Sequence, residues 1–393
     1  MSELEFKIYI KTRLSEAESA AELAKILNDF YLYFHPYSLL KIQSKSLNYY
    51  CSEKNCKNRY TKFQIKKKSG GIREINAPLQ GLKDIQRVIS ELLQFLIPVH
   101  ESAYGFTKKK NVALNAQLHL GKQFVYNIDI KDFFHSFSRS SVKLVLLDKD
   151  SGIFTSEKLA FLVAGICTYN IKPEAHIEQH VLPQGAPTSP VLTNILCLRL
   201  DRKLAGLAHR FNATYSRYAD DITFSADQNV FVIPAFQREL HRLITEVHKL
   251  ELQETKSRIQ HKSFRQEVTG VIVNEKLNVP KRFVKNLKMY LYLIEKYGEP
   301  FATQCYQKDF AKDRPNVSNE VIDLKAILGG KLHYLSMIRG KDDNVVMQLT
   351  ERFKRIFEIQ SKPKKQKPTQ LDQILNILLN KGLEEAMKAY LTK

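Results

Sequence analysis

Long apolar runs are missing from this chain. Hydrophobic residues make up 44% of its 393 positions, yet no stretch approaches the roughly 18 uncharged apolar residues that a membrane-spanning helix requires. The N-terminal sequence MSELEFKIYIKTR contains Glu3 and Glu5 and lacks the apolar core of a signal peptide. We therefore expect a cytoplasmic protein that makes no contact with a membrane.

Cysteine is also scarce. The chain has five cysteines, an odd number, and they are mostly scattered, which argues against a disulfide framework and fits a reducing compartment. Cys51 and Cys56 form one CxxxxC pair, but no second pair follows to complete a zinc site. We therefore predict no structural zinc.

Acidic residues are outnumbered. The chain has 61 Lys and Arg against 41 Asp and Glu, which gives a formal charge of +20 and a pI near 9.5. Such an excess indicates a polyanionic partner, and nucleic acid is the commonest polyanion. A basic soluble protein without such a partner remains the alternative at this point. The length is sufficient for two or three globular domains.

The predicted elements mix helices and strands. Ser15 and Glu18 form an S-x-x-E capping box, which predicts a helix beginning before AAELAKILNDF. FQIKKKSGGIREINAP predicts two strands joined by a tight turn at Gly70-Gly71, and LKDIQRVISELLQFL predicts an amphipathic helix. QFVYNIDI (123–130) is apolar enough for a central strand. Because no strict βαβ repeat is present, we predict an α+β fold.

A long helix and a hairpin are expected in the second half of this region. Ser189 is predicted to be the N-cap of the helix, with Pro190 at its first position and leucines following at three- and four-residue steps. ATYSRY and ITFSA predict two strands on either side of a turn at Ala219-Asp220-Asp221.

The pattern is helical after about residue 280. VKNLKMYLYLIEKYG, AILGGKLHYLSMIRG and VVMQLTERFKRIFEIQ each predict a helix. A basic linker (361–370) and two short helices broken at Gly382 are expected at the C-terminal end.

Two adjacent aspartates stand in YADD (218–221), where a hairpin turn would project both carboxylates to one end. Their repulsion is unfavourable unless a cation neutralises it. Asp129 ends a predicted buried strand, and a carboxylate there needs a partner. We therefore expect Asp129, Asp220 and Asp221 to converge on two Mg²⁺ ions, with Mn²⁺ able to substitute, as in two-metal phosphoryl transfer. The alternative for YADD is a solvated turn, and the nearby Asp132 is expected to be a surface carboxylate.

Several blocks, in their order and spacing, resemble the fingers and palm of reverse transcriptases. The blocks are FQIKKKSGGIR, NIDIKDFF, LPQGAPTSP, RYADD, ETK and QEVTG, over about residues 60–275. Within that family, the NAxxH element at 115–119 and VTG at 268–270 make the chain most similar to bacterial retron reverse transcriptases. The resemblance implies an RNA-directed DNA polymerase with a right-hand α+β fold of fingers, a palm made of an antiparallel sheet plus helices, and a helical thumb.

The resemblance divides the chain into four parts. They are an N-terminal helical segment (1–60), fingers and palm (61–275), a helical RNA-binding thumb (276–360), and a basic linker with a C-terminal helical extension (361–393). The last part resembles nothing that indicates a role.

The resemblance makes Asp129, Asp220 and Asp221 the catalytic metal-binding triad. It also gives the Ile130 carbonyl a place in one metal's shell and puts Tyr218 near the primer terminus.

Further positions are implied to hold the incoming nucleotide. Lys66 and Arg73 would bind the triphosphate, since an ammonium supplies a point charge and a guanidinium grips phosphate in a fork. Phe134 would exclude the ribose 2′-hydroxyl and so select deoxynucleotides. The alternatives are a solvated basic run for Lys66 and a core position for Phe134.

Three more residues are implied to line the same site. Gln184 and Gly185, in LPQGAP, would lie beside the nucleotide and the template. Lys256, in ETK, would act near the pyrophosphate leaving group, although Gln253 and Glu254 stand where the family usually has an asparagine.

RNA contacts are implied at two places. Asn115, His119 and Thr269 would be structural or contact RNA, and a buried hydrogen-bonding histidine is the alternative for His119. Lys281, Lys285 and Lys288 follow one side of a predicted helix and would contact RNA through its backbone.

The resemblance implies that the enzyme copies part of its own structured RNA into single-stranded DNA. Synthesis would be primed from an RNA 2′-hydroxyl and would give a branched RNA–DNA molecule used in anti-phage defence. The implied partners are the cognate non-coding RNA, dNTPs and an effector protein encoded nearby. The alternatives are a non-retron defence reverse transcriptase, and a ribonucleoprotein scaffold that binds RNA and restrains an effector.

Overall fold

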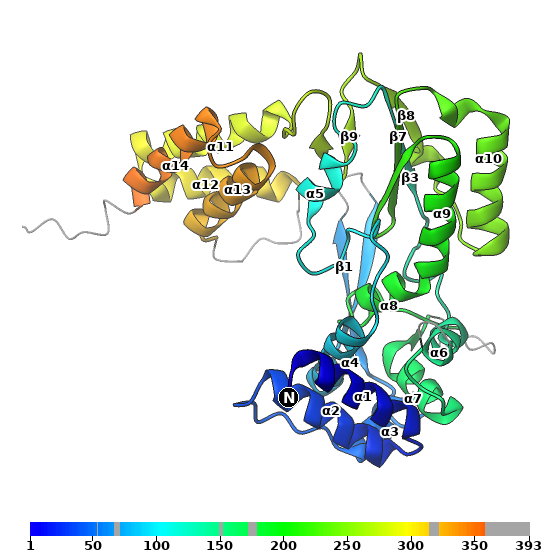
Figure 1. The fold of residues 1–393 in the computed structure, drawn as a ribbon. Coiled ribbons are helices and arrows are strands. Elements are labelled where there is room, and N and C mark those ends of the chain that lie inside the picture. The colour runs from blue at the N-terminus through cyan, green and yellow to red at the C-terminus, as the bar shows by residue number, and fades with distance from the viewer. Residues whose placement is uncertain (53, 67–70, 149–151, 172–178, 314–321, 358–393) are drawn as a thin grey trace, which may run out of the picture. The chain divides into compact units, whose positions relative to one another are not determined.

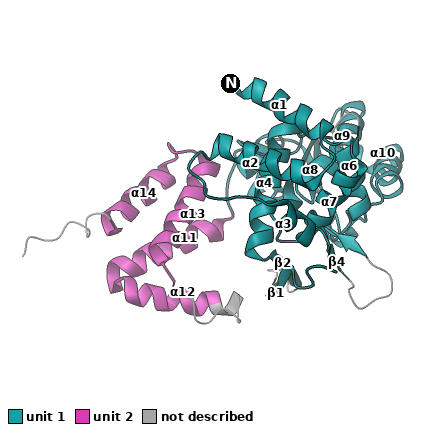
Figure 2. Ribbon diagram, turned by 90° about the horizontal axis from the view of Figure 1, so that it is seen from below, with its two compact units in different colours: residues 1–279 teal, residues 280–393 magenta. Residues whose placement is uncertain are grey.

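The computed structural model of the protein describes residues 1–52, 54–66, 71–148, 152–171, 179–313 and 322–357. The chain divides into two compact units, Met1–Val279 and Pro280–Lys393 (Figure 2). Gly70 of the predicted turn and the whole of the predicted linker and extension (361–393) lie outside the described residues. Within the described part, no helix has both the length and the apolar character needed to cross a bilayer.

A four-stranded antiparallel sheet lies at the centre of unit 1 (Figure 1). The strands predicted at 123–130 and on both sides of YADD are confirmed, and a fourth strand completes the sheet at its edge. In spatial order the strands are β6 (Thr214–Tyr218), β7 (Asp221–Ala226), β3 (Phe124–Asp129) and β8 (Arg258–His261). This arrangement confirms the predicted α+β fold with an antiparallel sheet.

Helices cover one face of this sheet. They are α8 (Ser189–Leu196), α9 (Leu198–Arg210) and α10 (Pro234–His241), followed by the π-helical stretch η2 (Arg242–Val247). Figure 1 shows α9 running alongside the sheet with α10 beyond it. Buried apolar residues of the helices, such as Leu204 and Phe236, join Ile222 and Phe224 of β7 in one core.

The single long helix predicted from Ser189 was wrong in two respects. Thr188 takes the N-cap position and Ser189 lies inside α8, because the Ser189 hydroxyl donates to the Pro183 carbonyl at 2.7 Å. The helix is also interrupted at Cys197, which separates α8 from α9. Leucines on both sides of the break are buried in the same core. Their spacing therefore follows one helical period through the break, and the sequence pattern does not show the interruption.

Two helices open the chain where one capping box was expected. α1 (Glu3–Glu16) begins with a box formed by Ser2 and Glu5, and α2 (Ala20–Phe34) begins with one formed by Ser19 and Glu22. The predicted box at Ser15 was wrong, because the Ser15 hydroxyl donates to the Thr12 carbonyl within the last turn of α1.

The predicted strand pair near residue 70 is confirmed as β1 (Tyr60–Lys66) and β2 (Ile72–Pro78), and the helix after it as α4 (Gln80–Leu96). The remaining elements of unit 1 are α3 (Ser44–Tyr50), α5 (Val112–Gln117), α6 (Arg139–Leu147), α7 (Glu157–Cys167), β4 (Tyr169–Asn170), β5 (His180–Val181), η1 (Val230–Val232), η3 (Glu254–Lys256), β9 (Glu267–Val268) and β10 (Val271–Ile272).

Unit 2 is helical in all its described elements. They are α11 (Lys281–Tyr297), α12 (Glu299–Asp313), α13 (Leu324–Arg339) and α14 (Asn344–Phe357). The sequence predicted three of them and missed α12, which has no clear apolar stripe. The helical character predicted after residue 280 is therefore confirmed for the residues described there, up to Phe357.

Candidate active site

The sheet register brings the three predicted aspartates to one end of the hairpin. Asp129 is the last residue of β3 and lies directly opposite Asp221, the first residue of β7. The Ile130 amide donates to the Asp220 carbonyl at 3.2 Å, which joins the end of β3 to the turn between β6 and β7. Within that turn Ala219 has φ of 58°, a backbone conformation in which few residues other than glycine are found.

These carboxylates repel one another in a partly buried place. Burial, and then the charges of Asp220 and Asp129, raise the pKa of Asp221 to about 7. Burial also raises the pKa of Asp220. Lys256 relieves part of this repulsion, because its ammonium lies 2.7 Å from the Asp129 carboxylate and its own pKa is raised by that hydrogen bond.

The oxygen donors at this end suit a hard divalent cation, since carboxylates with raised pKa values gain most from a nearby positive charge. In the described part of the chain, no three acidic, histidine or cysteine side chains are gathered closely enough to hold one metal ion as they stand. The Lys256 ammonium is the cation that neutralises Asp129 in this arrangement.

A cleft of about 740 Å³ opens beside the carboxylates. Arg73 from β2 lines it, together with Phe134, Gln184, Gly185 and Lys256, so the structure brings most of the predicted nucleotide residues together. Lys66 ends strand β1, is exposed, and is not among the cleft-lining residues. Its predicted triphosphate contact therefore has less support than that of Arg73.

Three cations that line the cleft, Lys83, Arg87 and Lys131, were not predicted from the sequence. Lys83 and Arg87 are one turn apart on α4 and line the same cleft as Arg73. Their spacing on the polar side of an amphipathic helix was the available signal, but only the fold shows that this side faces the cleft.

The loop of Gln184 and Gly185 is held against strand β2. The Asn76 amide donates to the Gln184 carbonyl at 2.8 Å. Gly185 has φ of 123°, and a Cβ there would lie 2.8 Å from the Ile75 side chain. The close approach of loop and strand thus requires glycine at 185.

A second cavity of about 590 Å³ is lined by Asp129 and Asp221 together with Tyr218. Thr269 and Gly270 of the VTG element also line it, and Thr269 has φ of 48°. Tyr218 and Thr269 therefore remain candidates for contact with a primer or RNA.

The three defining residues of the NAxxH element, Asn115, Ala116 and His119, are buried, which favours the structural reading of this element over RNA contact. His119 contacts both strands of the hairpin, because its two ring nitrogens are each 2.7 Å from a serine hydroxyl, Ser216 on β6 and Ser225 on β7. Burial lowers the pKa of His119 to about 3, so the ring is neutral. Asn115 is buried as well, and its amide is 3.5 Å from the Thr269 hydroxyl. The alternative of a buried hydrogen-bonding histidine is the one found.

An unpredicted buried ion pair supports the YADD turn. Arg217 on β6 and Asp201 on α9 are both fully buried, and the Arg217 guanidinium donates to the two Asp201 carboxylate oxygens at 2.8 and 2.7 Å. The same guanidinium donates to the Ala219 carbonyl at 3.1 Å and to the Asn194 side chain at 3.2 Å. The Tyr215 hydroxyl donates to Asp201 at 2.7 Å.

The turn is also closely packed on another side. Asn194 donates to the Gly105 carbonyl at 2.9 Å, and a Cβ at Gly105 would lie 2.4 Å from the Ala219 amide nitrogen. Position 105 therefore tolerates only glycine. The backbone of Ala219 is held by Arg217 of β6 and by the Gly105 segment, and Asn194 of α8 contacts both of them.

The three predicted thumb lysines, Lys281, Lys285 and Lys288, are exposed on α11. The opposite side of that helix, which includes Leu287 and Leu291, is buried within unit 2. The lysines are thus free to meet a ligand of unit 2.

Comparison with known proteins places these features in context. Residues 65–278 match the family described as reverse transcriptase (RNA-dependent DNA polymerase). The chain is 37% identical over 238 residues to the Retron Mx65 reverse transcriptase of Myxococcus xanthus, across 59% of this chain and 55% of that protein. It is 33% identical over 307 residues to the Retron Mx162 reverse transcriptase of the same organism, across 73% of this chain and 61% of that protein.

Among solved structures, telomerase from Candida albicans in complex with a TWJ fragment of telomeric RNA is similar with a TM-score of 0.41. It is 11% identical, and the alignment covers 90% of this chain and 70% of that one. The chain matches little more than half the length of the two Myxococcus relatives.

Proposed function

Because this chain belongs to the reverse transcriptase family of RNA-dependent DNA polymerases, we propose that it copies part of a cognate structured RNA into single-stranded DNA. The resemblance to retron reverse transcriptases, drawn from the sequence blocks, is confirmed by the similarity to the two Myxococcus enzymes. We propose further that synthesis starts from an RNA 2′-hydroxyl and gives a branched RNA–DNA molecule.

One observation carries the proposal: Asp129 and Asp221 face each other across two paired strands, with Asp220 beside them, at the edge of a cleft that also holds Arg73 and Phe134. Polymerases need grouped carboxylates of this kind, because they hold the divalent ions that supply a Lewis acid and orient the phosphate. Here Asp129, Asp220, Asp221 and the Ile130 carbonyl would hold them, with Mg²⁺ expected and Mn²⁺ as substitute.

Other residues of the cleft would position the nucleotide. The Arg73 guanidinium would bind the triphosphate in a fork, and Lys66 would add charge at the end of β1. The ring of Phe134 would stand against the sugar and exclude a 2′-hydroxyl. Gln184 and Gly185 would meet the base pair. Lys256, 2.7 Å from Asp129 in this structure, would turn to the pyrophosphate once a divalent ion neutralises that carboxylate.

The proposed biological setting follows from the family alone. We propose that the chain acts in the cytoplasm, with its non-coding RNA, dNTPs and an effector protein encoded nearby, in defence against phage. Unit 2 would serve as the thumb, and its exposed lysines Lys281, Lys285 and Lys288 would contact RNA phosphates.

The test is DNA synthesis by the purified chain, co-expressed with the RNA encoded beside its gene and supplied with Mg²⁺ and dNTPs. Asp220→Asn should abolish synthesis, since the amide keeps the shape but loses the charge that holds the ion. Asp132→Asn is the matched control, because Asp132 lines the same cleft, and asparagine tolerates its φ of 46°. This variant should remain active.

Digestion of the product with RNase distinguishes the alternatives. DNA that retains a short branched RNA remnant supports 2′-hydroxyl priming. DNA free of covalent RNA would indicate another class of reverse transcriptase. Absence of DNA from the wild type on its RNA would favour a ribonucleoprotein scaffold.

A further inference from the structure

The outward side of α9 carries a basic stripe (Arg199, Lys203, Gly206 and Arg210). These positions follow one another at steps of three or four residues, so they lie on one side of the helix, and all four are exposed. The other side of α9, which includes Leu204 and Leu207, is buried in the core of unit 1. None of the stripe residues lines the catalytic cleft.

Cations of a neighbouring element extend the stripe. Arg242, at the start of η2, hydrogen-bonds Glu239 and lowers the pKa of that carboxyl, and the charges of Arg210 and Lys203 lower it further. The three cations therefore gather around one glutamate. Apart from the buried Asp201, the acidic residues of α9, α10 and η2 are Glu239 and Glu246. The exposed Lys and Arg residues of these elements outnumber them.

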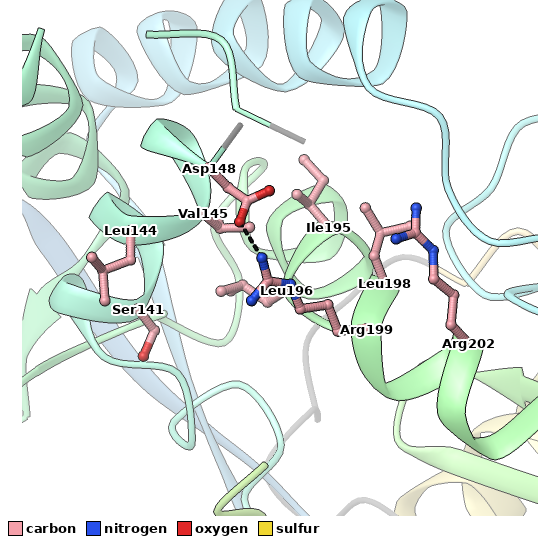
Figure 3. Close-up of a pocket in the computed structure, with 9 residues that line it drawn as sticks. All are labelled: Ser141, Leu144, Val145, Asp148, Ile195, Leu196, Leu198, Arg199 and Arg202. Carbon is pink, nitrogen blue, oxygen red and sulfur yellow. Dashed lines mark hydrogen bonds and ion pairs between the residues drawn. The ribbon is translucent and has the colours of Figure 1, made fainter. Parts of the chain in front are cut away.

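A hollow of about 180 Å³ lies at the start of the stripe, between α6 and the ends of α8 and α9 (Figure 3). Arg199 reaches across it to form an ion pair with Asp148, and Arg202 lines the hollow as well. Leu144, which also lines the hollow, is largely exposed. The hollow thus offers a guanidinium beside an apolar wall.

Gly206 has no structural reason to be glycine. Its φ lies in the ordinary helical range, and a Cβ there would meet nothing within 4 Å. A glycine inside a helix makes the helix less stable than alanine would. Between Lys203 and Arg210, the missing side chain leaves a flat place where a phosphate backbone can come close to the helix.

We propose that the α9 stripe, with Arg242, binds backbone phosphates of structured RNA outside the catalytic cleft. This inference rests on the proposed function, because a structured RNA is far larger than a cleft of about 740 Å³ and must lie partly on other surfaces. Cations set along one line of a helix can contact successive phosphates of an RNA backbone. Binding of this kind recognises the shape of the RNA and not its sequence.

The experiment measures the affinity of the full chain for a long RNA duplex over a series of salt concentrations. Lys203→Gln with Arg210→Gln should weaken binding severalfold and reduce the slope of log K against log salt by about two, one for each lost phosphate contact. Gly206→Gln should also weaken binding without lowering the melting temperature, because glutamine favours the helix but fills the flat place.

The matched control is Lys11→Gln with Lys158→Gln, which removes the same charge from exposed positions on α1 and α7. The control should bind as the wild type does. Equal affinity and salt slope for the stripe variant and wild type would overturn the proposal, and so would equal weakening of the stripe variant and the control.

Extension of a short primer–template that fills only the cleft separates this inference from the proposed function. The stripe variants should extend it at the wild-type rate. Failure of the wild type to extend it would refute the polymerase activity, while the duplex measurement would still decide whether the stripe binds RNA.

Discussion

Replacing Arg217 by lysine should disturb the turn that carries Asp220 and Asp221 while keeping the buried charge pair. Lysine can still neutralise Asp201, but a single ammonium cannot also reach the two acceptors that the guanidinium now serves, the Ala219 carbonyl and the Asn194 side chain. Leaving a buried acceptor unpaired costs about 1–3 kcal/mol. Two such acceptors give roughly 2–6 kcal/mol, and about 1–3 kcal/mol if lysine restores one of the two bonds.

The effect on catalysis should exceed what unfolding explains. Ala219 precedes Asp220, and freeing its carbonyl lets both carboxylates of the turn shift. A displacement of about 1 Å in a catalytic group lowers the rate by about a hundredfold. We therefore expect kcat on a primer–template to fall by about 10- to 100-fold, and the Mg²⁺ concentration for half-maximal rate to rise.

Tyr215→Phe is the matched control. It removes one hydrogen bond to Asp201 at 2.7 Å but no contact with the turn, and Asp201 keeps both bonds from Arg217. It should cost about 1 kcal/mol of stability and leave kcat unchanged. Rates and thermal unfolding would be measured at a temperature where all variants are folded. If Arg217→Lys then keeps the kcat of Tyr215→Phe, the ion pair serves stability alone.

Three further predictions concern single residues. His119→Gln should lose less stability on acidification than the wild type does. Because the folded pKa of His119 is about 3, the free energy of unfolding of the wild type falls by about 1.4 kcal/mol for each pH unit below pH 6.5. Urea unfolding of both proteins at pH 7 and pH 5 measures the difference. Asp221→Asn, measured at pH 8 without divalent ions, should raise the free energy of unfolding by at least about 1 kcal/mol. The reason is that the folded pKa of Asp221 is about 7, so the stability of the wild type declines as the pH rises from 4 to 7. A melting temperature equal to or below that of the wild type would contradict this. Phe134→Ala should reduce the preference for dNTPs over rNTPs at least about tenfold, measured as the ratio of kcat/KM values, and an unchanged ratio would return Phe134 to a purely core role.

Local patterns were sufficient where a residue's role depends on its neighbours in the chain. The strand composition around Asp129 and around YADD placed the three aspartates at strand ends, and a strand end fixes where a carboxylate can point. The capping box of α2 and the start of α8 were misplaced by a few residues, because several serines compete for a cap and only tertiary contacts select among them.

The sequence by itself determined the fold class, the helical character of the described residues after 280 and which three aspartates meet at the end of the hairpin. Tertiary structure alone decided which buried residues support these aspartates. Asp201 falls at helical spacing with Leu204 and Ala208, on the buried side of α9. This spacing could have indicated a buried carboxylate, but its partner Arg217 lies on a separate strand. Likewise Asn115 and Thr269 meet although they are 154 residues apart. Periodicity shows which side of an element is buried, whereas the partner it meets there is set by the register and packing of the whole chain.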